Sequence, residues 1–600
     1  MSRDPLDILR HVFGYPSFRG HQAEVIAHVA GGGDALVLMP TGSGKSLCYQ
    51  VPSIVRDGVG VVISPLIALM HDQVAALDEL GVRAAYLNST LSFAEAARTE
   101  QLVREGALDL VYIAPERLLN ERTLALLDES PLALFAIDEA HCVSQWGHDF
   151  RSEYLQLAVL AERYPAVPRI AVTATADAQT KAEIQQRLQL TSARVFTSSV
   201  DRPNIRYRVV EKLNGRKQVL DFIRAEHAGD AGIVYCLTRK KVEETAEFLA
   251  EHDIDALPYH AGMSAGERSR NQERFQREDG VVMVATIAFG MGIDKPDVRF
   301  VAHLDLPKSV EGYYQETGRA GRDGLPADAW MAYGLQDVVQ QRQLIEMSEA
   351  GDEHKKIQIG KLDAMLGFCE TSECRRMRLL AYFGEQGAPC GNCDICLDPP
   401  VTEDGTVPMQ QLLSCIVRVR QRFGAMHVID ILRGEATDKV LQWQHGELST
   451  FGIGAERSAQ EWRAIIRQAI AMGYIVVDHA NWSALRLTAK AGPVLKGTER
   501  VQLREYRAPA KAKREKKGKK AAAIVADLPL ESLAVFERLR EWRRATALTH
   551  GVPAYVIFHD ATLKELAWRR PGSLAELGTI GGIGEKKLEA YGGEILALVQ

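Results

Sequence analysis

Residues 132–141 read Leu-Ala-Leu-Phe-Ala-Ile-Asp-Glu-Ala-His, an apolar run that passes directly into two acids. The apolar part predicts a buried strand of a parallel sheet, with the acids at its carboxyl end. At that position α/β nucleotide-binding sheets present their catalytic carboxylates. We therefore expect Asp138 to hold Mg²⁺ and Glu139 to polarise a water that attacks a γ-phosphate. Taken alone, the two acids could also simply end a strand.

A second strand–loop–helix pattern lies upstream of these acids. Apolar residues 35–39 precede Pro-Thr-Gly-Ser-Gly-Lys-Ser at 40–46, and a helical pattern follows. Glycines let backbone N–H groups close around phosphate oxygens, while Lys45 can reach the β- and γ-phosphates and Ser46 can ligate Mg²⁺. The general P-loop pattern has glycine where this chain has Met39. The other loop residues are expected to complete the phosphate cradle: Thr41, Gly42, Ser43 and Gly44.

Two arginines indicate a third part of the same site. Residues 315–322 read Gln-Glu-Thr-Gly-Arg-Ala-Gly-Arg and place Arg319 and Arg322 three positions apart. Arginine stabilises charge that develops on a transferred phosphoryl group, an effect worth about 10³ to 10⁵ in rate. Apolar segments before this loop predict a second α/β unit: 232–236, 281–286 and 300–305. Two such units would form a cleft that closes on ATP.

The cysteine spacing predicts a metal site. Three cysteines stand at C-x₂-C-x₂-C spacing: Cys390, Cys393 and Cys396. A ferredoxin-type run would continue with cysteine where this chain has Pro400, which disfavours an iron–sulfur cluster. Tetrahedral Zn²⁺ with four thiolates is favoured. Cys369 and Cys374 both lie upstream as candidates for the fourth ligand.

Composition is compatible with several folded domains. The chain has 600 residues, of which 46% are hydrophobic and 25% charged. It lacks an apolar run of eighteen residues and an N-terminal signal pattern, so we expect a soluble, cytoplasmic protein with no membrane association. The net charge of −6 is uneven, because residues 507–520 carry eight basic residues and one acidic residue. This stretch is interpreted as a linker, either a solvated tether or a DNA-binding arm.

Four further segments occur in an order that is specific to one family: 13–22, 64–73, 171–176 and 285–294. Together with the motifs above, they resemble the RecQ family of ATP-dependent DNA helicases, a DEAH-box variant of superfamily 2, in its bacterial form. The resemblance implies that Tyr15 stacks on adenine, Arg19 supports it and Gln22 hydrogen-bonds its edge. It also selects Cys374 as the fourth zinc ligand and Arg322 as the arginine that faces the γ-phosphate.

The resemblance implies a multidomain chain of two RecA-like α/β lobes, a zinc-binding helical subdomain, a winged helix and a small C-terminal helical HRDC domain. We expect these domains at residues 1–200, 201–340, 341–403, 404–506 and 527–600, with a basic linker at 507–526.

The resemblance also implies DNA contacts in the loop after the acids, in a recognition helix over 461–472 and at the tip of a β-wing over 475–487. The expected contact residues are Trp146, Phe150, Arg151, Arg463, Arg467 and Trp482. Packing into a core is the alternative for both tryptophans. The glycine-rich turn at 579–587 could clamp a phosphate or be purely structural.

The function implied by the resemblance is 3′–5′ translocation on single-stranded DNA with unwinding of duplexes, in recombination, repair and the SOS response. Its cofactors would be ATP, Mg²⁺ and Zn²⁺, and its partners single-stranded and duplex DNA. A single-strand-binding protein is compatible as a further partner, and a monomer is favoured. Alternatives are a binding protein with a spent ATPase, an RNA helicase, or a translocase that does not separate strands. The zinc and winged-helix segments favour DNA.

Overall fold

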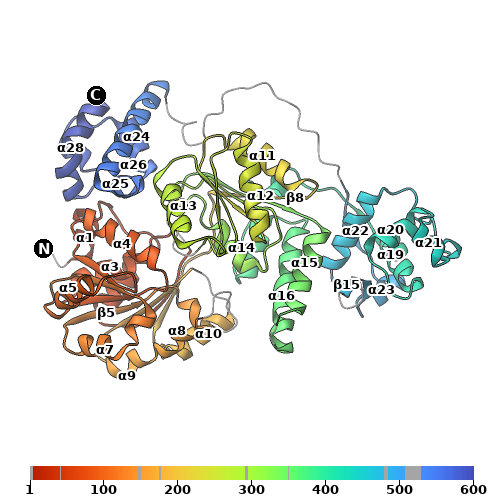
Figure 1. Cartoon of the computed structure of the whole chain (residues 1–600), viewed down its shortest axis with the longest axis horizontal. Helices are drawn as coiled ribbons and strands as arrows, with labels where there is room; N and C mark the ends of the chain where they lie inside the picture. Colours follow the sequence, from red (N-terminus) through yellow and green to blue (C-terminus); the bar gives the residue numbers. More distant parts are fainter. Residues whose placement is uncertain are drawn as a thin grey trace.

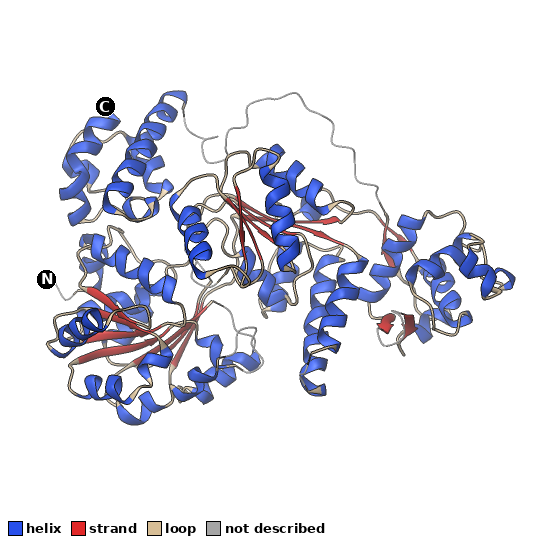
Figure 2. Ribbon diagram, viewed as in Figure 1, coloured by secondary structure: helices blue, strands red, loops and turns tan. Residues whose placement is uncertain are grey.

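A computed structural model describes residues 4–40, 42–144, 151–174, 178–290, 295–348, 351–478, 484–506 and 529–600. Two α/β lobes lie next to each other, a helical region follows at the far side of the second lobe, and the C-terminal helices lie beside the first lobe (Figures 1 and 2). This architecture confirms the predicted fold class. Among the described helices, none has both the length and the apolar character needed to cross a membrane.

Lobe 1 is built on a seven-stranded parallel sheet in the order β3-β4-β2-β5-β6-β1-β7. Neighbouring strand residues such as Val61 and Val62 belong to two different apolar clusters, because successive side chains point to opposite faces. Helices cover both faces, which explains why the strands are apolar throughout. The strands are β1 (Ala35–Leu38), β2 (Val59–Ile63), β3 (Ala84–Leu87), β4 (Leu110–Ile113), β5 (Leu132–Ile137), β6 (Arg169–Thr173) and β7 (Arg194–Thr197).

The helices of lobe 1 are α1 (Pro5–His11), α2 (Gln22–Ala30), α3 (Leu47–Val55), α4 (Ile67–Glu79), α5 (Phe93–Arg104), α6 (Pro115–Leu118), α7 (Glu121–Asp128), η1 (Ala140–Val143), α8 (Ser152–Gln156), α9 (Val159–Arg163) and α10 (Ala178–Arg187).

Lobe 2 repeats this plan with a six-stranded parallel sheet in the order β10-β11-β9-β12-β13-β8. Its strands are β8 (Ile205–Glu211), β9 (Gly232–Tyr235), β10 (Ala256–Tyr259), β11 (Val282–Ala285), β12 (Phe300–His303) and β13 (Ala327–Tyr333). Its helices are α11 (Gly215–Glu226), α12 (Arg239–Ala250), α13 (Ala265–Arg277) and α14 (Val310–Thr317).

The region after lobe 2 is mainly helical. It begins with α15 (Leu335–Glu346), α16 (Asp352–Cys369), α17 (Arg375–Tyr382) and α18 (Asp394–Leu397). A helical domain with a short hairpin follows: β14 (Thr402–Asp404), α19 (Thr406–Arg418), α20 (Ala425–Arg433), α21 (Asp438–Gln442), η2 (His445–Glu447), α22 (Ala459–Ala471), β15 (Ile475–Asp478), β16 (Ala484–Leu487), α23 (Ala491–Leu495) and β17 (Gln502–Arg504).

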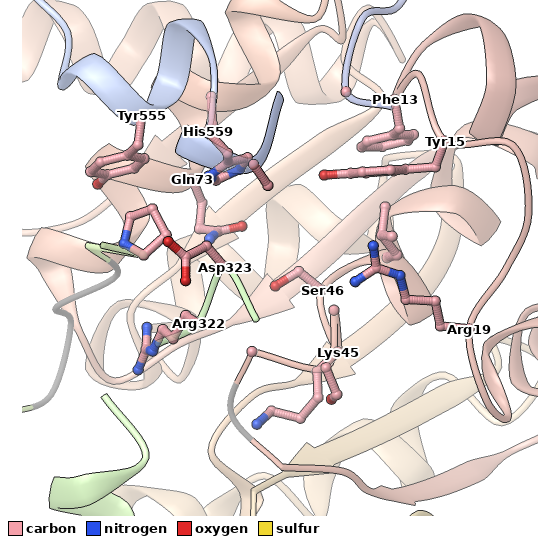
Figure 3. Close-up of a pocket in the computed structure, with 18 of the residues that line it drawn as sticks. Phe13, Tyr15, Arg19, Lys45, Ser46, Gln73, Arg322, Asp323, Tyr555 and His559 are labelled. Atoms are coloured by element: carbon pink, nitrogen blue, oxygen red, sulfur yellow. The ribbon is translucent and has the colours of Figure 1, made fainter. Parts of the chain in front are cut away.

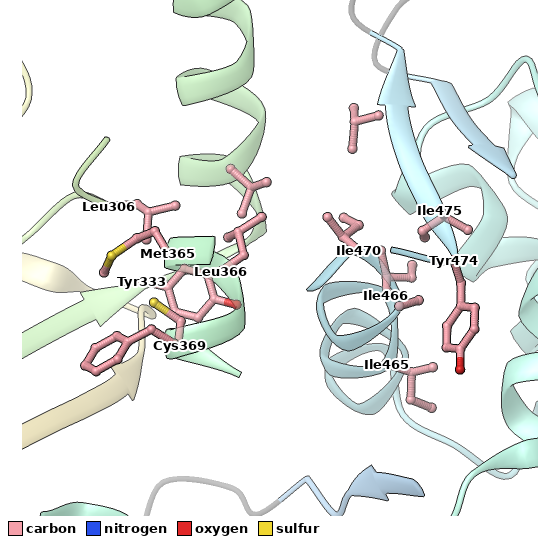
Figure 4. Packing of buried hydrophobic residues seen from close by; sticks show 14 of the residues in the cluster. Leu306, Tyr333, Met365, Leu366, Cys369, Ile465, Ile466, Ile470, Tyr474 and Ile475 are labelled. Carbon is pink, nitrogen blue, oxygen red and sulfur yellow. The ribbon is translucent and has the colours of Figure 1, made fainter. Parts of the chain in front are cut away.

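Lobe 2 and the following helices share one continuous apolar core. Leu366 on α16 and Ile466 on α22 are fully buried members of the same cluster, and Figure 4 shows these two helices facing each other. A polar contact reinforces the apolar one, because the Arg467 guanidinium lies between Glu211 of lobe 2, at 2.9 Å, and Glu370, at 3.2 Å. The hairpin domain is therefore attached firmly to lobe 2.

The C-terminal domain consists of α24 (Leu530–His550), α25 (Ala554–Ile557), α26 (Asp560–Arg569), α27 (Leu574–Leu577) and α28 (Glu585–Val599). It contacts both lobes, close to α4 and α13 in Figure 1. On lobe 1, the Tyr591 hydroxyl donates to Glu79 over 3.2 Å and the Gly582 N–H donates to the Gly14 carbonyl over 2.9 Å. On lobe 2, Asp279 accepts from Arg544 over 2.6 Å and lies 3.2 Å from Arg540.

This docking generates a first prediction. Asp279→Arg would place a third cation beside Arg540 and Arg544, and like charges brought together cost several kcal/mol. We expect the C-terminal domain to separate from lobe 2, with an increased radius of gyration in small-angle X-ray scattering. Arg538→Asp is the matched control, because Arg538 is exposed on α24, the helix that also carries Arg540 and Arg544. Identical scattering curves for wild type and Asp279→Arg would contradict the docking.

Candidate nucleotide site, zinc centre and nucleic-acid surface

The loop after β1 has the geometry that a phosphate cradle requires. Gly42 and Gly44 adopt φ of +79° and +77°, a region that side chains with a Cβ rarely adopt. Lys45 Nζ donates to the Met39 carbonyl over 3.0 Å, which holds the ammonium over the loop. Ser46 directly precedes α3, so the loop opens onto a helix N-terminus. Thr41 lies outside the described residues.

Gln22 connects the segment at 13–22 to this loop. Its side-chain amide donates to the carbonyls of Ser43, over 3.0 Å, and Gly44, over 3.2 Å. Its carbonyl oxygen accepts from the Arg19 N–H over 2.8 Å. A Cβ at Gly44 would lie 2.6 Å from the Gln22 amide nitrogen, so this contact itself requires glycine. Gln22 therefore braces the P-loop in this structure, a contact that the sequence pattern did not indicate.

The two acids stand at the carboxyl end of β5, as the apolar pattern predicted. Asp138 accepts the Glu139 N–H over 2.9 Å. Burial and the charge of Glu139 raise the pKa of Asp138 to about 7, although Lys45 lowers it. Glu139 has φ of +48°, an uncommon conformation for a residue with a side chain. A strained backbone and a raised pKa are typical of functional sites.

His141 connects the acids to the segment at 171–176. Its Nδ1 lies 3.3 Å from the Glu139 carboxylate and 2.9 Å from the Thr173 hydroxyl at the end of β6. The imidazole is 4% exposed, so this contact chain is shielded from solvent. A displacement of Glu139 can thus be transmitted through His141 to the end of β6.

The arginine loop of lobe 2 meets the P-loop of lobe 1. Arg319 is buried, and its guanidinium donates to the Gly290 carbonyl. The Arg322 Cα lies only 3.3 Å from the place where a Cβ at Gly42 would stand. The two lobes therefore bring the cradle, the acids and both arginines to a single cavity of about 690 Å³, within the range of small-molecule sites. Tyr15, Arg19 and Gln22 also line this cavity.

The C-terminal domain supplies another wall of this cavity. Tyr555 and His559 lie on the side opposite Lys45 in Figure 3, and Phe558 and Lys587 also line the space. Lys587 donates to the carbonyls of Val556 and Ile557, and burial lowers its pKa to about 8. These residues follow the P-loop by some five hundred positions, and no local motif indicates their place.

The four cysteines form a compact metal centre. The sulfurs of Cys374, Cys390, Cys393 and Cys396 all lie within 4.8 Å of one another. Two sulfur pairs are separated by 3.9 and 4.0 Å, against about 3.8 Å for tetrahedral zinc with bonds of about 2.3 Å. Backbone N–H groups of Met377 and Cys390 outweigh burial and lower the pKa of Cys374 to about 7. The donor set fits Zn²⁺, and the predicted zinc site is confirmed.

The predicted DNA-contact residues are described only in part. Trp146, Phe150 and Trp482 lie outside the described residues. Arg151 donates to the Pro65 carbonyl over 3.0 Å, beside the segment at 64–73. Arg463 is half-buried on α22, and its guanidinium donates to the Met426 sulfur.

Arg467 requires a correction. The prediction placed it with Arg463 on a DNA-facing helix surface. In the structure its side chain is 10% exposed and lies between Glu211 and Glu370. A guanidinium that is largely enclosed between two carboxylates is not presented to a phosphate, so the structure does not support Arg467 as a DNA contact.

Family models match nearly the whole chain in the order of its domains. They are a DEAD/DEAH box helicase at 19–184, a helicase conserved C-terminal domain at 214–324, RecQ zinc-binding at 335–397, an RQC domain at 399–512 and an HRDC domain at 532–599. The protein named ATP-dependent DNA helicase RecQ in Haemophilus influenzae is 45% identical over 99% of this chain and 95% of its own length. The chain belongs to the RecQ family of ATP-dependent DNA helicases.

Two further bacterial relatives agree with this membership. The RecQ helicase of Pasteurella multocida is 44% identical over 100% of this chain and 94% of its own length. That of Bacillus subtilis is 40% identical over 99% of this chain and 98% of its own length. The resemblance to the bacterial form of the family, predicted from the motifs, is therefore confirmed.

The raised pKa of Asp138 generates a second prediction. An acid whose pKa is higher in the folded than in the unfolded protein disfavours folding once it is ionised. This destabilisation grows as the pH rises from the pKa of the unfolded state to the pKa of the folded state. Asp138→Asn should therefore lose ATPase activity but raise the melting temperature of the metal-free protein, because the amide removes a carboxylate that is costly to ionise in this buried position. We expect the gain in melting temperature over wild type to grow between about pH 4 and pH 7, that is, between the ordinary and the raised pKa of Asp138. A gain in melting temperature that does not depend on pH, or a lower melting temperature than wild type, would contradict the raised pKa of Asp138.

The zinc centre generates a third prediction. Cys393→Ser should lose bound zinc and lower the melting temperature, because structural zinc sites carry about 10–16 kcal/mol of apparent binding energy. Cys369→Ser is the matched control, since Cys369 is buried nearby but outside the cluster, and it should keep one zinc per chain. Full zinc content in Cys393→Ser by mass spectrometry of the native protein would overturn the assignment.

Proposed function

We propose that this chain moves 3′ to 5′ along single-stranded DNA and unwinds duplexes, with ATP hydrolysed in the cavity between its lobes. The observation that supports this most strongly is that the P-loop, the two acids and both arginines, which come from two separate lobes, line one cavity. The direction of movement and a role in recombination and repair follow from membership of the family.

Each side chain can be given a role in hydrolysis. Lys45 and the N–H groups of residues 42–46 would bind the phosphates, and Asp138 with Ser46 would hold Mg²⁺, which neutralises phosphate charge. Glu139 would accept a proton from the attacking water. Arg322, with Arg319, would stabilise the charge that develops on the γ-phosphoryl group. Hydrolysis would release the arginines, so that the lobes separate and shift their grips on the strand.

Simple energetics favour repeated ATP-driven steps over binding alone. Stacking in duplex DNA averages about 1.4 kcal/mol per step, so opening twenty pairs costs about 28 kcal/mol. Non-covalent affinity reaches its limit near about −18 to −21 kcal/mol. Binding energy therefore cannot open such a duplex completely, whereas many successive hydrolysis steps can.

The proposal also includes the DNA contacts, the oligomeric state, a protein partner and the cellular location. Single-stranded and duplex DNA would contact Arg151 and Arg463 together with Trp146, Phe150 and Trp482. A monomer is the proposed oligomeric state. A single-strand-binding protein as partner and a cytoplasmic, nucleoid-associated location are proposals from the family.

Unwinding of a short duplex with a single-stranded tail tests this proposal. We expect ATP-dependent strand separation with a 3′ tail but not with a 5′ tail. Lys45→Ala should reduce kcat for ATP by about 10²-fold or more, because it removes a positioned charge from the phosphates. ATPase activity that is stimulated by single strands without strand separation would identify a translocase instead. Full ATPase activity in Lys45→Ala would refute the cavity as the catalytic site.

A further inference from the structure

The segment between the lobes contains an arginine that the mechanism above does not use. Residues 198–204 connect β7 of lobe 1 to β8 of lobe 2. Within this segment, the Arg202 side chain is directed into lobe 2 and is only 9% exposed. Three main-chain carbonyls accept hydrogen bonds from its guanidinium.

Arg202 binds the turn that carries the two catalytic arginines. Its Nη1 donates to the Gly318 carbonyl over 3.0 Å. Its Nη2 donates to the carbonyls of Ala320, over 2.8 Å, and Gly321, over 2.9 Å. These acceptors lie on both sides of Arg319 and immediately before Arg322. A single planar guanidinium therefore spans the turn.

The turn needs such support because it follows the end of α14. The last carbonyls of a helix have no partner within the helix and must be satisfied by other groups. Asn204 adds two bonds, since its side-chain amide donates to Gly321, over 2.8 Å, and to Leu325, over 2.9 Å. Gly321 has φ of +57°, and a Cβ there would lie 2.5 Å from the Asn204 amide nitrogen. The shape of the turn and the position of the connecting segment thus depend on each other.

The other side of the connecting segment is fixed by the zinc-binding region. Glu385 accepts the Val200 N–H over 2.7 Å and the Ser199 hydroxyl over 2.6 Å. Arg376, two positions after the zinc ligand Cys374, donates to the Pro203 carbonyl over 3.0 Å and to that of Ile205 over 2.8 Å. Arg202 is therefore anchored on a backbone that the zinc-binding region holds in place.

We propose that Arg202 is a positioning residue for the hydrolysis step: it holds residues 318–322 so that Arg319 and Arg322 face the phosphates across the cleft. It acts only through the backbone of the turn and does not contact the nucleotide. The proposal rests on the function proposed for the cavity. Misplacement of a catalytic group by about 1 Å can cost about 10²-fold in rate, which sets the scale of the effect.

The test compares Arg202→Lys with wild type in the full chain. Lysine keeps the charge but cannot span three carbonyls, so the turn loses its shape. We expect kcat for ATP at saturating single-stranded DNA to fall by about 10- to 100-fold. The dissociation constant of a fluorescent ATP analogue should change less than twofold, because the P-loop is untouched. Zinc content should match wild type.

Arg206→Lys is the matched control. Arg206 lies four positions further on and is partly buried, but it pairs with Glu226 and Asp328 rather than with the turn. We expect its kcat to equal that of wild type. If Arg202→Lys does not fold, Asn204→Ala replaces it, with a smaller loss of kcat expected because two of the five bonds to this region are removed.

Combination with Arg322→Ala distinguishes positioning from general damage. If Arg202 acts through the turn, Arg202→Lys should lower kcat much less in the Arg322→Ala background than in wild type. Wild-type kcat in Arg202→Lys, or equal fold losses in both backgrounds, would overturn the proposal. Failure of the proposed function itself would be recognised separately, because Lys45→Ala would then retain ATPase activity.

Discussion

The close approach of the P-loop to the arginine loop is the contact on which the rest of the structure depends. Gly42 and Arg322 lie in loops of different lobes, yet the Arg322 Cα would lie 3.3 Å from a Cβ at Gly42. In lobe 1 the P-loop and the acids follow the carboxyl ends of β1 and β5, whereas in lobe 2 the arginine turn precedes β13, and its Gly321 N–H donates to the Val298 carbonyl just before β12. The chain places these two sheet edges against each other, and the cavity exists only where they meet.

Everything around the cavity maintains this arrangement. The connecting segment is held to the arginine turn by Arg202 and to the zinc-binding region by Arg376. The hairpin domain is attached to lobe 2 through an apolar core and Arg467, so movement of lobe 2 carries it along. The C-terminal domain touches both lobes and closes the outer side of the cavity. ATP hydrolysis can therefore move these parts as coupled bodies.

Short sequence patterns predicted those features whose residues lie close together in the chain. An apolar run before Asp138 predicted a strand end, and the spacing of three cysteines predicted a metal. Spacing alone did not decide between Cys369 and Cys374, and the resemblance to the family did. Contacts between distant segments could not be predicted. The position of Arg467 on its helix was compatible with an exposed side chain. Its partner Glu211 lies 256 residues away in the sequence, so no local pattern indicated their contact.

A structure of the chain with a non-hydrolysable ATP analogue and Mg²⁺ would test the shared cavity most directly. The account predicts that the phosphates lie against residues 42–46, that Mg²⁺ contacts Asp138, and that Arg322 of the opposite lobe reaches the γ-phosphate. A nucleotide held by lobe 1 alone, with Arg322 directed to solvent, would contradict a site made by both lobes.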